Sequence, residues 1–492
     1  MLILIIIFGA LLRLISLYNA GSFWFDETFT LYFAKLPWSE AWQYLQFENN
    51  PPLHFFLARI FFILLGHNEF LLRLLSVVMS VGTIPIVYLL GKKAHSYIVG
   101  LIAAAFFAIS GLSIFNAIEF RMYPLLMFLS AVSLLYFLKY LEKNKIKHLA
   151  IITFINALLV LTHITGTMVV LIEIIYFFLK FKKSRWKFVL WQIIPGVALM
   201  TWALPSFATR VLMDIPNAWY FGEIFDPLFF LKQFYAFLIF PTINNFPGWL
   251  TVVIGLGLLI VAIRSLGGFK KDTRLVFEPS NIHFVDLLFL LALAPVLIGS
   301  VLNVQIPKQY SISLVPFLLL LSVGIVELIK DKRLRIIIVV CIIGAFTALN
   351  YPAILRKPYA LDKLVQAIEK ESVPQTEILA AAHIYTLPLE LYYHGGMPVK
   401  PIYFGEDQAI DKMRLVRHNW HINYYSKEQL DHFLAIETKL YTTILVVGTT
   451  HWQKEGDIVR LWFMNHGWRL ARTYSWEGYF NPDLYVFKKI AK

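Results

Sequence analysis

The chain has 492 residues, of which 58% are hydrophobic and 15% charged, and it carries a net charge of +13. Soluble proteins contain about 25% charged residues, so the composition excludes an ordinary soluble protein. Apolar blocks of about 20 residues, the length of a membrane-spanning helix, recur from residue 1 to about residue 351. We therefore expect a polytopic α-helical membrane protein. Its basic residues fall in short gaps between the blocks, which argues against nucleic-acid binding.

About eleven membrane spans are predicted. They cover residues 1–18, 69–91, 97–116, 122–140, 148–162, 165–181, 187–205, 246–264, 283–302, 310–329 and 334–351. The first block lacks the basic leader and the small-residue cleavage site of a signal peptide, so we expect it to span the membrane. Alternate gaps are basic, from Lys92 and Lys93 to Lys332 and Arg333. The positive-inside rule makes those gaps cytoplasmic.

The remaining gaps then face outward, and the longest are 19–68 and 206–245. Two apolar stretches within them, 51–67 and 227–241, are poor spans. The first starts with a double proline and contains Arg59, and the second is short and bounded by prolines. We expect each to lie in the membrane interface or to dip in from outside, with a span as the alternative.

The composition changes after about residue 351, where charged, polar and short apolar segments alternate. "EILAAAH" (377–383) and "TTILVVG" (442–448) are typical of buried strands, and "TLPLELYYHGG" (386–396) of a helix closed by glycine. Residues 352–492 are therefore predicted to form a soluble α/β domain on the outer face, following a membrane domain of residues 1–351.

"SFWFDETFT" (22–30) holds the first two acidic residues of the chain, Asp26 and Glu27, just past the first span. They could simply belong to a solvated loop or to a first helical turn, where acidic residues are favoured. A carboxylate at a membrane surface can also act as a general base. Aromatic neighbours such as Trp24 and Phe25 can line a site for a sugar or an isoprenoid chain.

Further polar residues lie at the predicted outer ends of the apolar helices. They are Arg59, Arg73, Glu119, Arg121, Tyr123, His163, Lys308 and Tyr310. Each could have an ordinary role, as a snorkelling cation, an interface aromatic or a polar turn. A charge near the middle of the bilayer is costly, and less so near the interface. Several charges of both signs at one membrane level therefore predict a polar cleft, whose cations could stabilise a phosphate. A lipid-linked phosphosugar would fit such a cleft, and the sequence shows no glycine-rich nucleotide loop.

Several segments resemble, in family order, motifs of the protein O-mannosyltransferase and aminoarabinose-transferase superfamily of GT-C membrane glycosyltransferases. "WFDETFT" resembles its Asp-Glu motif, "ENNPPLHFFLARIF" its His-Pro-Pro-Leu segment and "NEFLLRLLSVV" the arginine-containing start of its second span. "EFRMYPLLMFLS" is similar to its Arg-x-Tyr helix start, "LTHITG" to its Thr-His turn and "PKQYSISLVPFLLL" to its Arg-Tyr segment. Asn50 stands where histidine is common, and Gln309 where arginine is usual. The outer tail is similar to that of bacterial members, including relatives of the lipopolysaccharide-core glycosyltransferases.

The resemblance implies a hexosyl- or pentosyltransferase that moves a sugar from a polyprenyl-phosphate donor, generally with inversion, to a hydroxyl of a glycolipid, polysaccharide or protein. It implies Asp26 as the general base and Glu27 as an orienting residue. The candidates for binding the donor phosphate or the substrate are Arg121, Tyr123, Lys308 and Tyr310, then Arg73 and His163, with Arg59 and Trp24 completing the set. The enzyme would be a multi-pass plasma-membrane protein with an extracytoplasmic active site and C-terminal domain. No cofactor is predicted, and a divalent metal is left open because His and carboxylate residues cluster thinly.

Two other classes of function are considered. A transporter or flippase for a lipid-linked sugar would use the same cleft as a gate. Such proteins often carry internal repeats and interrupted helices near the middle of the membrane, but this sequence shows no repeat and its polar residues cluster on the outer side. A membrane-anchored binding protein would need far fewer spans.

Overall fold

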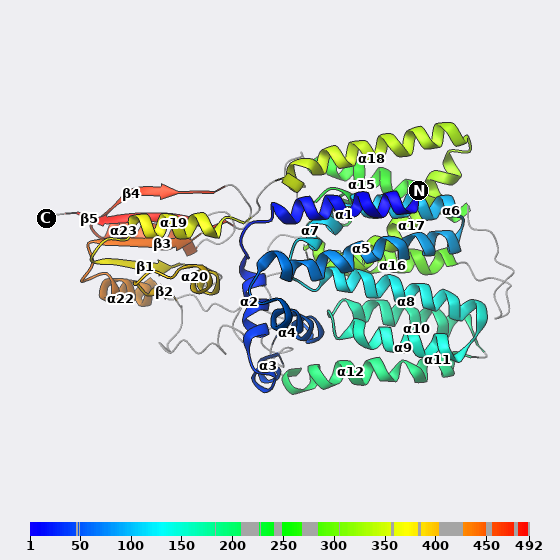
Figure 1. The fold of residues 1–492 in the computed structure, drawn as a ribbon, viewed down its shortest axis with the longest axis horizontal. Coiled ribbons are helices and arrows are strands. Elements are labelled where there is room, and N and C mark those ends of the chain that lie inside the picture. The colour runs from blue at the N-terminus through cyan, green and yellow to red at the C-terminus, as the bar shows by residue number, and fades with distance from the viewer. Residues whose placement is uncertain are drawn as a thin grey trace. The chain divides into compact units, whose positions relative to one another are not determined.

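The structure is a computed structural model. It describes residues 1–45, 48, 50–182, 184–207, 226, 228–240, 248–267, 284–304, 306–355, 359–381, 385–402, 427–448, 455–476 and 481–490. The chain divides into two compact units, drawn in Figure 1, and each is described by itself. The helical unit contains the described residues of 1–18 and 37–355, and the α/β unit those of 19–36 and 356–492.

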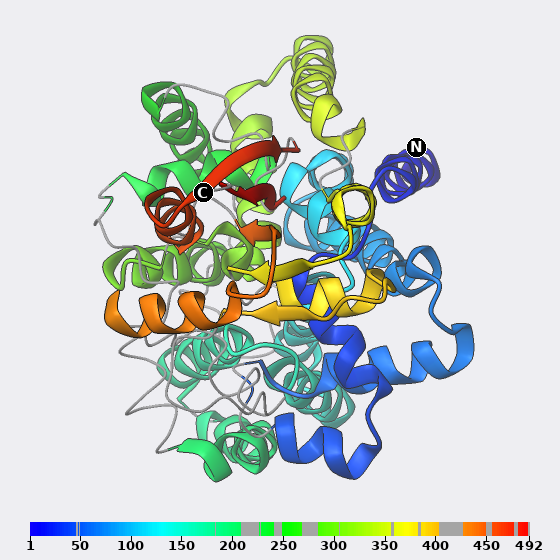
Figure 2. The same ribbon diagram turned by 90° about the vertical axis from the view of Figure 1, so that its left-hand side faces the viewer.

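The helical unit, most of whose long helices run side by side in Figure 1 and are seen nearly end-on in Figure 2, is built mainly from apolar helices. In chain order they are α1 (Leu2–Tyr18), α3 (Trp38–Leu45), α4 (Leu53–Leu65), α5 (Glu69–Ala94), α6 (Tyr97–Ile109), α7 (Gly111–Ala117), α8 (Tyr123–Lys143), α9 (Ile146–Val160), α10 (Gly166–Lys180), α11 (Arg185–Trp191), α12 (Ile193–Ala203), α14 (Phe229–Leu238), α15 (Gly248–Ile263), α16 (Phe284–Val301), α17 (Ser311–Leu328) and α18 (Lys332–Leu355). Short 3₁₀ turns are η1 (Leu204–Ser206), η4 (Arg264–Gly267) and η5 (Pro307–Tyr310).

All the predicted spans fall on helices, and two of them are broken. The span 97–116 corresponds to α6 and α7, which meet at an angle of 55°, and 187–205 corresponds to α11 and α12. Among the described residues, five helices are long and apolar enough to cross a membrane, or six if the bent pair forms one span. The chain therefore has the helices of a membrane protein, while the count of eleven spans stays a prediction.

The bend between α6 and α7 has a local cause. Ser110 caps α7, because its Oγ accepts a hydrogen bond of 3.2 Å from the N–H of Ser113. Gly111 follows, and a side chain there would collide with the backbone of Phe240. The Asn350 side chain donates to the last carbonyls of α6 (3.1 Å) and α14 (2.8 Å). These contacts stabilise the bend between α6 and α7.

The two poor spans form short helices, α4 and α14, with 13 and 10 residues. In α14, Phe234 and Phe237 are fully buried and both rings pack on Phe317 of α17, at 4.8 and 5.6 Å between centroids. This burial favours a segment that dips into the helical unit over one that lies flat in the interface. The rest of the segment 206–245, which is predicted to be an outer loop, lies mostly outside the described residues.

The α/β unit contains one five-stranded sheet of order β2-β1-β3-β5-β4. Its strands are β1 (Thr376–Ala380), β2 (Val399–Pro401), β3 (Thr443–Gly448), β4 (Trp468–Tyr474) and β5 (Asp483–Lys489). Its helices are α2 (Phe25–Lys35), α19 (Leu361–Glu371), α20 (Thr386–Tyr392), α22 (Lys427–Glu437) and α23 (Glu455–Asn465). The β1 strand pairs in parallel with β2 and β3, whereas β5 runs antiparallel to β3 and β4.

The predicted strands and helix of this unit are found where the sequence indicates. Both β1 and β3 are buried along their whole length, as continuous apolar runs in a covered sheet are. The α20 helix ends at Tyr392, just before Gly395 and Gly396. The α/β architecture is thus observed, while its location on the outer face stays a prediction.

Candidate active site

The predicted catalytic carboxylates lie at the start of α2, in the α/β unit. Trp24 is the N-cap residue, with an extended backbone, and its N–H lies 3.4 Å from Glu27 Oε2. A carboxylate at the third helical position often returns to the N-cap in this way. Glu27 is fully buried, whereas Asp26 is half-buried. Of the two carboxylates, only Asp26 is therefore accessible to a substrate, as a general base must be.

Residues 21–25, called the strap below, precede Asp26 and contact the C-terminal part of the same unit. Gly21 forms a parallel bridge with Tyr359 and has a φ of 78°, which a glycine adopts without strain. Trp24 stacks on the ring of Tyr359, with 5.7 Å between centroids and 5° between planes. One tyrosine thus holds both ends of a four-residue stretch.

Hydrogen bonds fix the two residues between them. The Ser22 hydroxyl accepts a bond of 2.9 Å from the N–H of Leu361, the first residue of α19. The N–H of Phe23, which is fully buried, donates to the Tyr392 hydroxyl at 2.6 Å. Ser22 supplies an acceptor for the start of α19, where a helix lacks its own.

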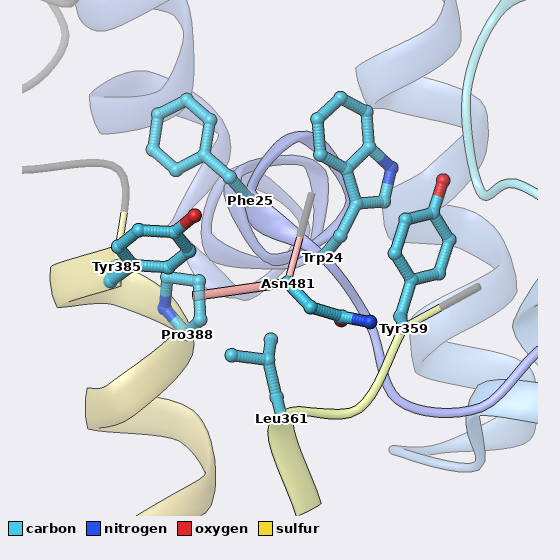
Figure 3. Close-up of a pocket in the computed structure, with 7 residues that line it drawn as sticks. All are labelled: Trp24, Phe25, Tyr359, Leu361, Tyr385, Pro388 and Asn481. Carbon is cyan, nitrogen blue, oxygen red and sulfur yellow. The ribbon is translucent and has the colours of Figure 1, made fainter. Parts of the chain in front are cut away.

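A small pocket opens beside the strap (Figure 3). Its lining residues are Trp24, Phe25, Tyr359, Leu361, Tyr385, Pro388 and Asn481. The Asn481 side-chain oxygen accepts a bond of 2.8 Å from the N–H of Ala360, which fixes the amide. Burial, together with the charge of Asp483, raises the pKa of Tyr385, so its hydroxyl stays protonated. Aromatic faces and two polar groups therefore line a pocket that includes Trp24 and Phe25, the two residues before Asp26.

In the helical unit, three predicted residues from distant segments meet. Lys308 Nζ lies 2.6 and 2.7 Å from the two carboxylate oxygens of Glu119, and both side chains are buried. The ammonium also lies over the rings of Phe115 (4.7 Å) and Tyr123 (6.0 Å). The Tyr123 ring is 5.5 Å from that of His163. The turn before α8, the loop before α10 and η5 therefore form one polar cluster.

Arg121 and Arg73 are the further cations of this region. Arg121 is buried, and its carbonyl accepts a bond of 3.4 Å from the Ser76 hydroxyl of α5. Arg73 is also buried and lies one helical turn before Ser76. Charged side chains buried among apolar membrane helices are rare and often functional, so both stay candidates for anion binding.

His163 is neutral in this cluster. Burial, followed by the positive charge of Arg121, lowers the pKa of His163 to about 3. Its Nδ1 faces both the N–H (3.2 Å) and the hydroxyl (2.8 Å) of Thr165. Because the backbone N–H can only donate, Nδ1 is the acceptor and the imidazole proton is on Nε2. A neutral donor thus stands beside Tyr123.

Two other predicted residues have different surroundings. The Tyr310 hydroxyl donates to the Val304 carbonyl at 2.5 Å, which closes the turn between α16 and η5, and its ring packs on Phe229. The Arg59 guanidinium lies over the Trp38 ring of α3, 4.8 Å from its centroid. These contacts favour structural roles for Tyr310 and Arg59.

Three features of the site are not evident from the sequence. Glu119 was noted only as a boundary residue, and its pairing with Lys308 was not predicted. His54, buried 3.3 Å from the Phe120 carbonyl, was missed although it directly follows the Pro-Pro-Leu segment. The partners of the strap, Tyr359 and Tyr392 among them, had no sequence signal. Among the described residues, no group of three or more His, Cys, Asp and Glu side chains could hold a metal ion.

The chain is similar to known proteins in part of its sequence and in its fold. Residues 49–212 match the family described as dolichyl-phosphate-mannose-protein mannosyltransferase. No curated protein sequence matches the chain. The structure is similar to that of ArnT from Cupriavidus metallidurans bound to undecaprenyl phosphate, with a TM-score of 0.58, 12% identity, and 98% of this chain and 97% of the other covered.

Two further solved structures are similar over nearly the whole chain. One is the Archaeoglobus fulgidus oligosaccharyltransferase AglB in complex with an inhibitory peptide and a dolichol-phosphate, with a TM-score of 0.50, 14% identity, and 98% and 74% of the two chains covered. The other is the arabinofuranosyltransferase AftD from Mycobacteria, with a TM-score of 0.50, 12% identity, and 99% and 41% covered. At these identities the likeness concerns the fold.

Proposed function

The chain has the GT-C glycosyltransferase fold, and we propose that it transfers a sugar from a polyprenyl-phosphate-linked donor to an acceptor hydroxyl, with inversion at the anomeric carbon. The observation that carries the proposal is the buried cluster of Lys308, Arg121 and His163 in the helical unit. Polar anion-binding groups among apolar helices suit a ligand whose charged head is joined to a lipid tail. In line with this, ArnT was solved with undecaprenyl phosphate and AglB with a dolichol-phosphate.

The donor phosphate is proposed to bind the cations and neutral donors of this cluster. Lys308 and Arg121 would supply charge, and His163 Nε2–H and the Tyr123 hydroxyl would supply hydrogen bonds; Arg73 would add a second guanidinium. Bonds from charged donors to phosphate are about twice as strong as neutral ones. Because the site is buried, they would also stabilise the phosphate as it leaves with added charge.

Asp26 is proposed as the general base. The acceptor oxygen attacks the anomeric carbon, its proton passes to the Asp26 carboxylate, and the bond from that carbon to the phosphate oxygen breaks with its electron pair on the polyprenyl phosphate. The half-buried position of Asp26 in the first turn of α2 supports this role, because its carboxylate is partly exposed while Glu27 beside it is fully buried. Buried Glu27 would fix the helix start, and Trp24 would line the substrate side.

The location and the substrates complete the proposal. We propose a multi-pass plasma-membrane enzyme whose active site and α/β domain are extracytoplasmic, because the basic gaps between spans are expected in the cytoplasm. The acceptor would be a glycolipid, a polysaccharide or a protein hydroxyl, and the sugar a hexose or pentose.

The test is turnover of a panel of labelled polyprenyl-phosphate sugars by the purified protein in detergent, with membrane extract as the acceptor source. Wild type should release or transfer the label from at least one donor, and Asp26→Asn should lose about 100- to 10,000-fold in rate, as expected for loss of a general base. Asp286→Asn is the matched control, because Asp286 is also partly exposed in a first helical turn. It should turn over at the wild-type rate.

Two outcomes would contradict the proposal. Near-normal transfer by Asp26→Asn would remove Asp26 from the chemistry. Absence of turnover by folded wild type, with movement of the labelled lipid across vesicle membranes, would favour the transporter alternative.

A further inference from the structure

The strap is bound to the C-terminal part of its unit at every position before Asp26. Gly21 and Trp24 contact Tyr359, and the two residues between them hydrogen-bond to α19 and α20. Phe25 then lines the pocket formed by residues of the same segments. Five consecutive residues are therefore placed by groups more than 330 positions away in the sequence.

These contacts are specific rather than merely apolar. Ser22 accepts from the first N–H of α19, whose own N-cap residue, Ala360, has no side-chain acceptor. The N–H of Ala360 is in turn bound by Asn481. The start of α19 is thus bound from two sides, by the strap and by Asn481, which lies two residues before β5. The strap and this helix start are therefore joined by a direct hydrogen bond.

We propose that the C-terminal segment is a positioning domain of the enzyme, in which Tyr359, Tyr392 and Asn481 act through the strap to set the position of Asp26. The proposal rests on the assignment of Asp26 as the base. None of the three residues needs to touch the substrate. Their effect on the reaction would arise because proton transfer requires a base within hydrogen-bond reach of the acceptor hydroxyl.

Tyr392→Phe is the sharpest perturbation, because it removes a single oxygen. It leaves the buried N–H of Phe23 without this acceptor, at a point three residues before Asp26. A misplacement of about 1 Å can reduce a rate by about 100-fold, so we expect a loss of about 10- to 100-fold in kcat with little change in the donor KM. Tyr393→Phe makes the same chemical change one residue later, where the ring lies against Gly395, and should keep the wild-type kcat.

A double-mutant cycle separates positioning from general damage to the fold. If Tyr392 acts only by placing Asp26, then Tyr392→Phe should not lower the residual rate of Asp26→Asn any further. A structural defect would instead lower that residual rate by the same factor as in wild type. An equal drop in both backgrounds, or an unchanged kcat in Tyr392→Phe alone, would overturn the proposal.

A second measurement does not depend on activity. The chain has a single cysteine, Cys341, so Asp26→Cys in a Cys341→Ala background gives one site for a nitroxide spin label. Adding Tyr392→Phe should increase the mobility of the label, and adding Tyr393→Phe should not. Equal mobility in all three proteins would refute the positioning role. If Tyr392→Phe increases the mobility of the label but the wild-type protein turns over no donor, the proposed function fails and the positioning of residue 26 stands.

Discussion

Replacement of Glu119 by glutamine tests whether Lys308 is a donor-binding cation. In the structure the Lys308 ammonium lies 2.6 and 2.7 Å from the two carboxylate oxygens, and the Glu119 side chain is fully buried. Removing one partner of a buried ion pair costs about 3–5 kcal/mol, because it leaves an uncompensated charge. Glutamine keeps one oxygen near the ammonium, so we expect Glu119→Gln to lower the free energy of unfolding by about 3 kcal/mol.

Bound donor should then stabilise the folded state of Glu119→Gln more than that of wild type. A bound ligand stabilises the folded state by about 2.7 kcal/mol at a concentration 100 times its Kd. If the donor phosphate binds Lys308, it supplies the negative charge that the substitution removed. Thermal unfolding in detergent, with and without a polyprenyl phosphate, should therefore show a larger ligand-induced stabilisation in Glu119→Gln than in wild type.

The control is a surface ion pair of the same unit. Lys180 and Asp286 are 3.1 Å apart, with side chains about a third exposed, and exposed pairs contribute about 0–1 kcal/mol. Asp286→Asn should therefore change stability little and leave the effect of the lipid unchanged. Equal stabilisation of wild type and Glu119→Gln by the polyprenyl phosphate would show that the phosphate does not reach Lys308.

Three other substitutions test separate parts of the helical unit. Lys308→Ala should raise the donor KM more than the acceptor KM, in steady-state assays that vary each substrate; an unchanged donor KM would contradict its role. The pKa of His163 lies below that of an unfolded histidine, near 6.5, so the unfolded state binds the extra proton and stability is lost as pH falls through 6.5. Between pH 7 and 5.5 wild type should lose about 1 kcal/mol more than His163→Gln in thermal unfolding, and parallel curves would refute this. Glu173→Ala should cost about 3 kcal/mol in the same assay, since it leaves the Ser133 hydroxyl (2.9 Å) and the Asn156 amide (2.9 Å) without this acceptor; a loss below about 1 kcal/mol would contradict it.

Much of the fold follows from patterns that are local in the sequence. An apolar run of sufficient length forms a helix in a membrane because every backbone group must be satisfied internally, and each predicted span is helical. The strands β1 and β3 likewise contain short apolar runs that the sequence marks as buried. Broken helices are harder to predict, because the break between α6 and α7 depends on the close approach of Phe240, a residue far away in sequence.

Hydrogen-bonded polar groups that are buried inside the spans are also not predictable from the sequence. Arg13 lies in the middle of an apolar block, yet it is fully buried and donates to the carbonyls of Gly9 and Ala108, both at 2.9 Å, and to the hydroxyl of Ser80. Its partners come from three different segments. Hydropathy registers the single charge and cannot register acceptors that only the packing of helices supplies.

The candidate site also contains residues that the sequence indicates and partners that only the tertiary structure shows. Asp26, Lys308 and His163 could be selected from the sequence because they belong to a group of charged and polar residues at the predicted outer ends of the apolar helices. What could not be predicted is the set of groups that hold them. In the sequence, Tyr392 lies near the end of a predicted helix closed by glycine, and Glu119 lies at a helix boundary. Only the tertiary structure shows that Tyr392 binds the strap and that Glu119 binds the Lys308 ammonium.

Gln309 stands where the similar family motif has arginine, and the structure indicates which neighbouring residue supplies the positive charge. The related motif has arginine at this position, so its absence left open which residue carries the positive charge. Residues 307–310 form a 3₁₀ turn, in which successive side chains point about 120° apart. Lys308 is therefore directed into the unit, where it is buried against Glu119, while Gln309 is half-exposed. The turn presents position 308 inward and not position 309, which supports Lys308 as the residue that replaces the missing arginine charge.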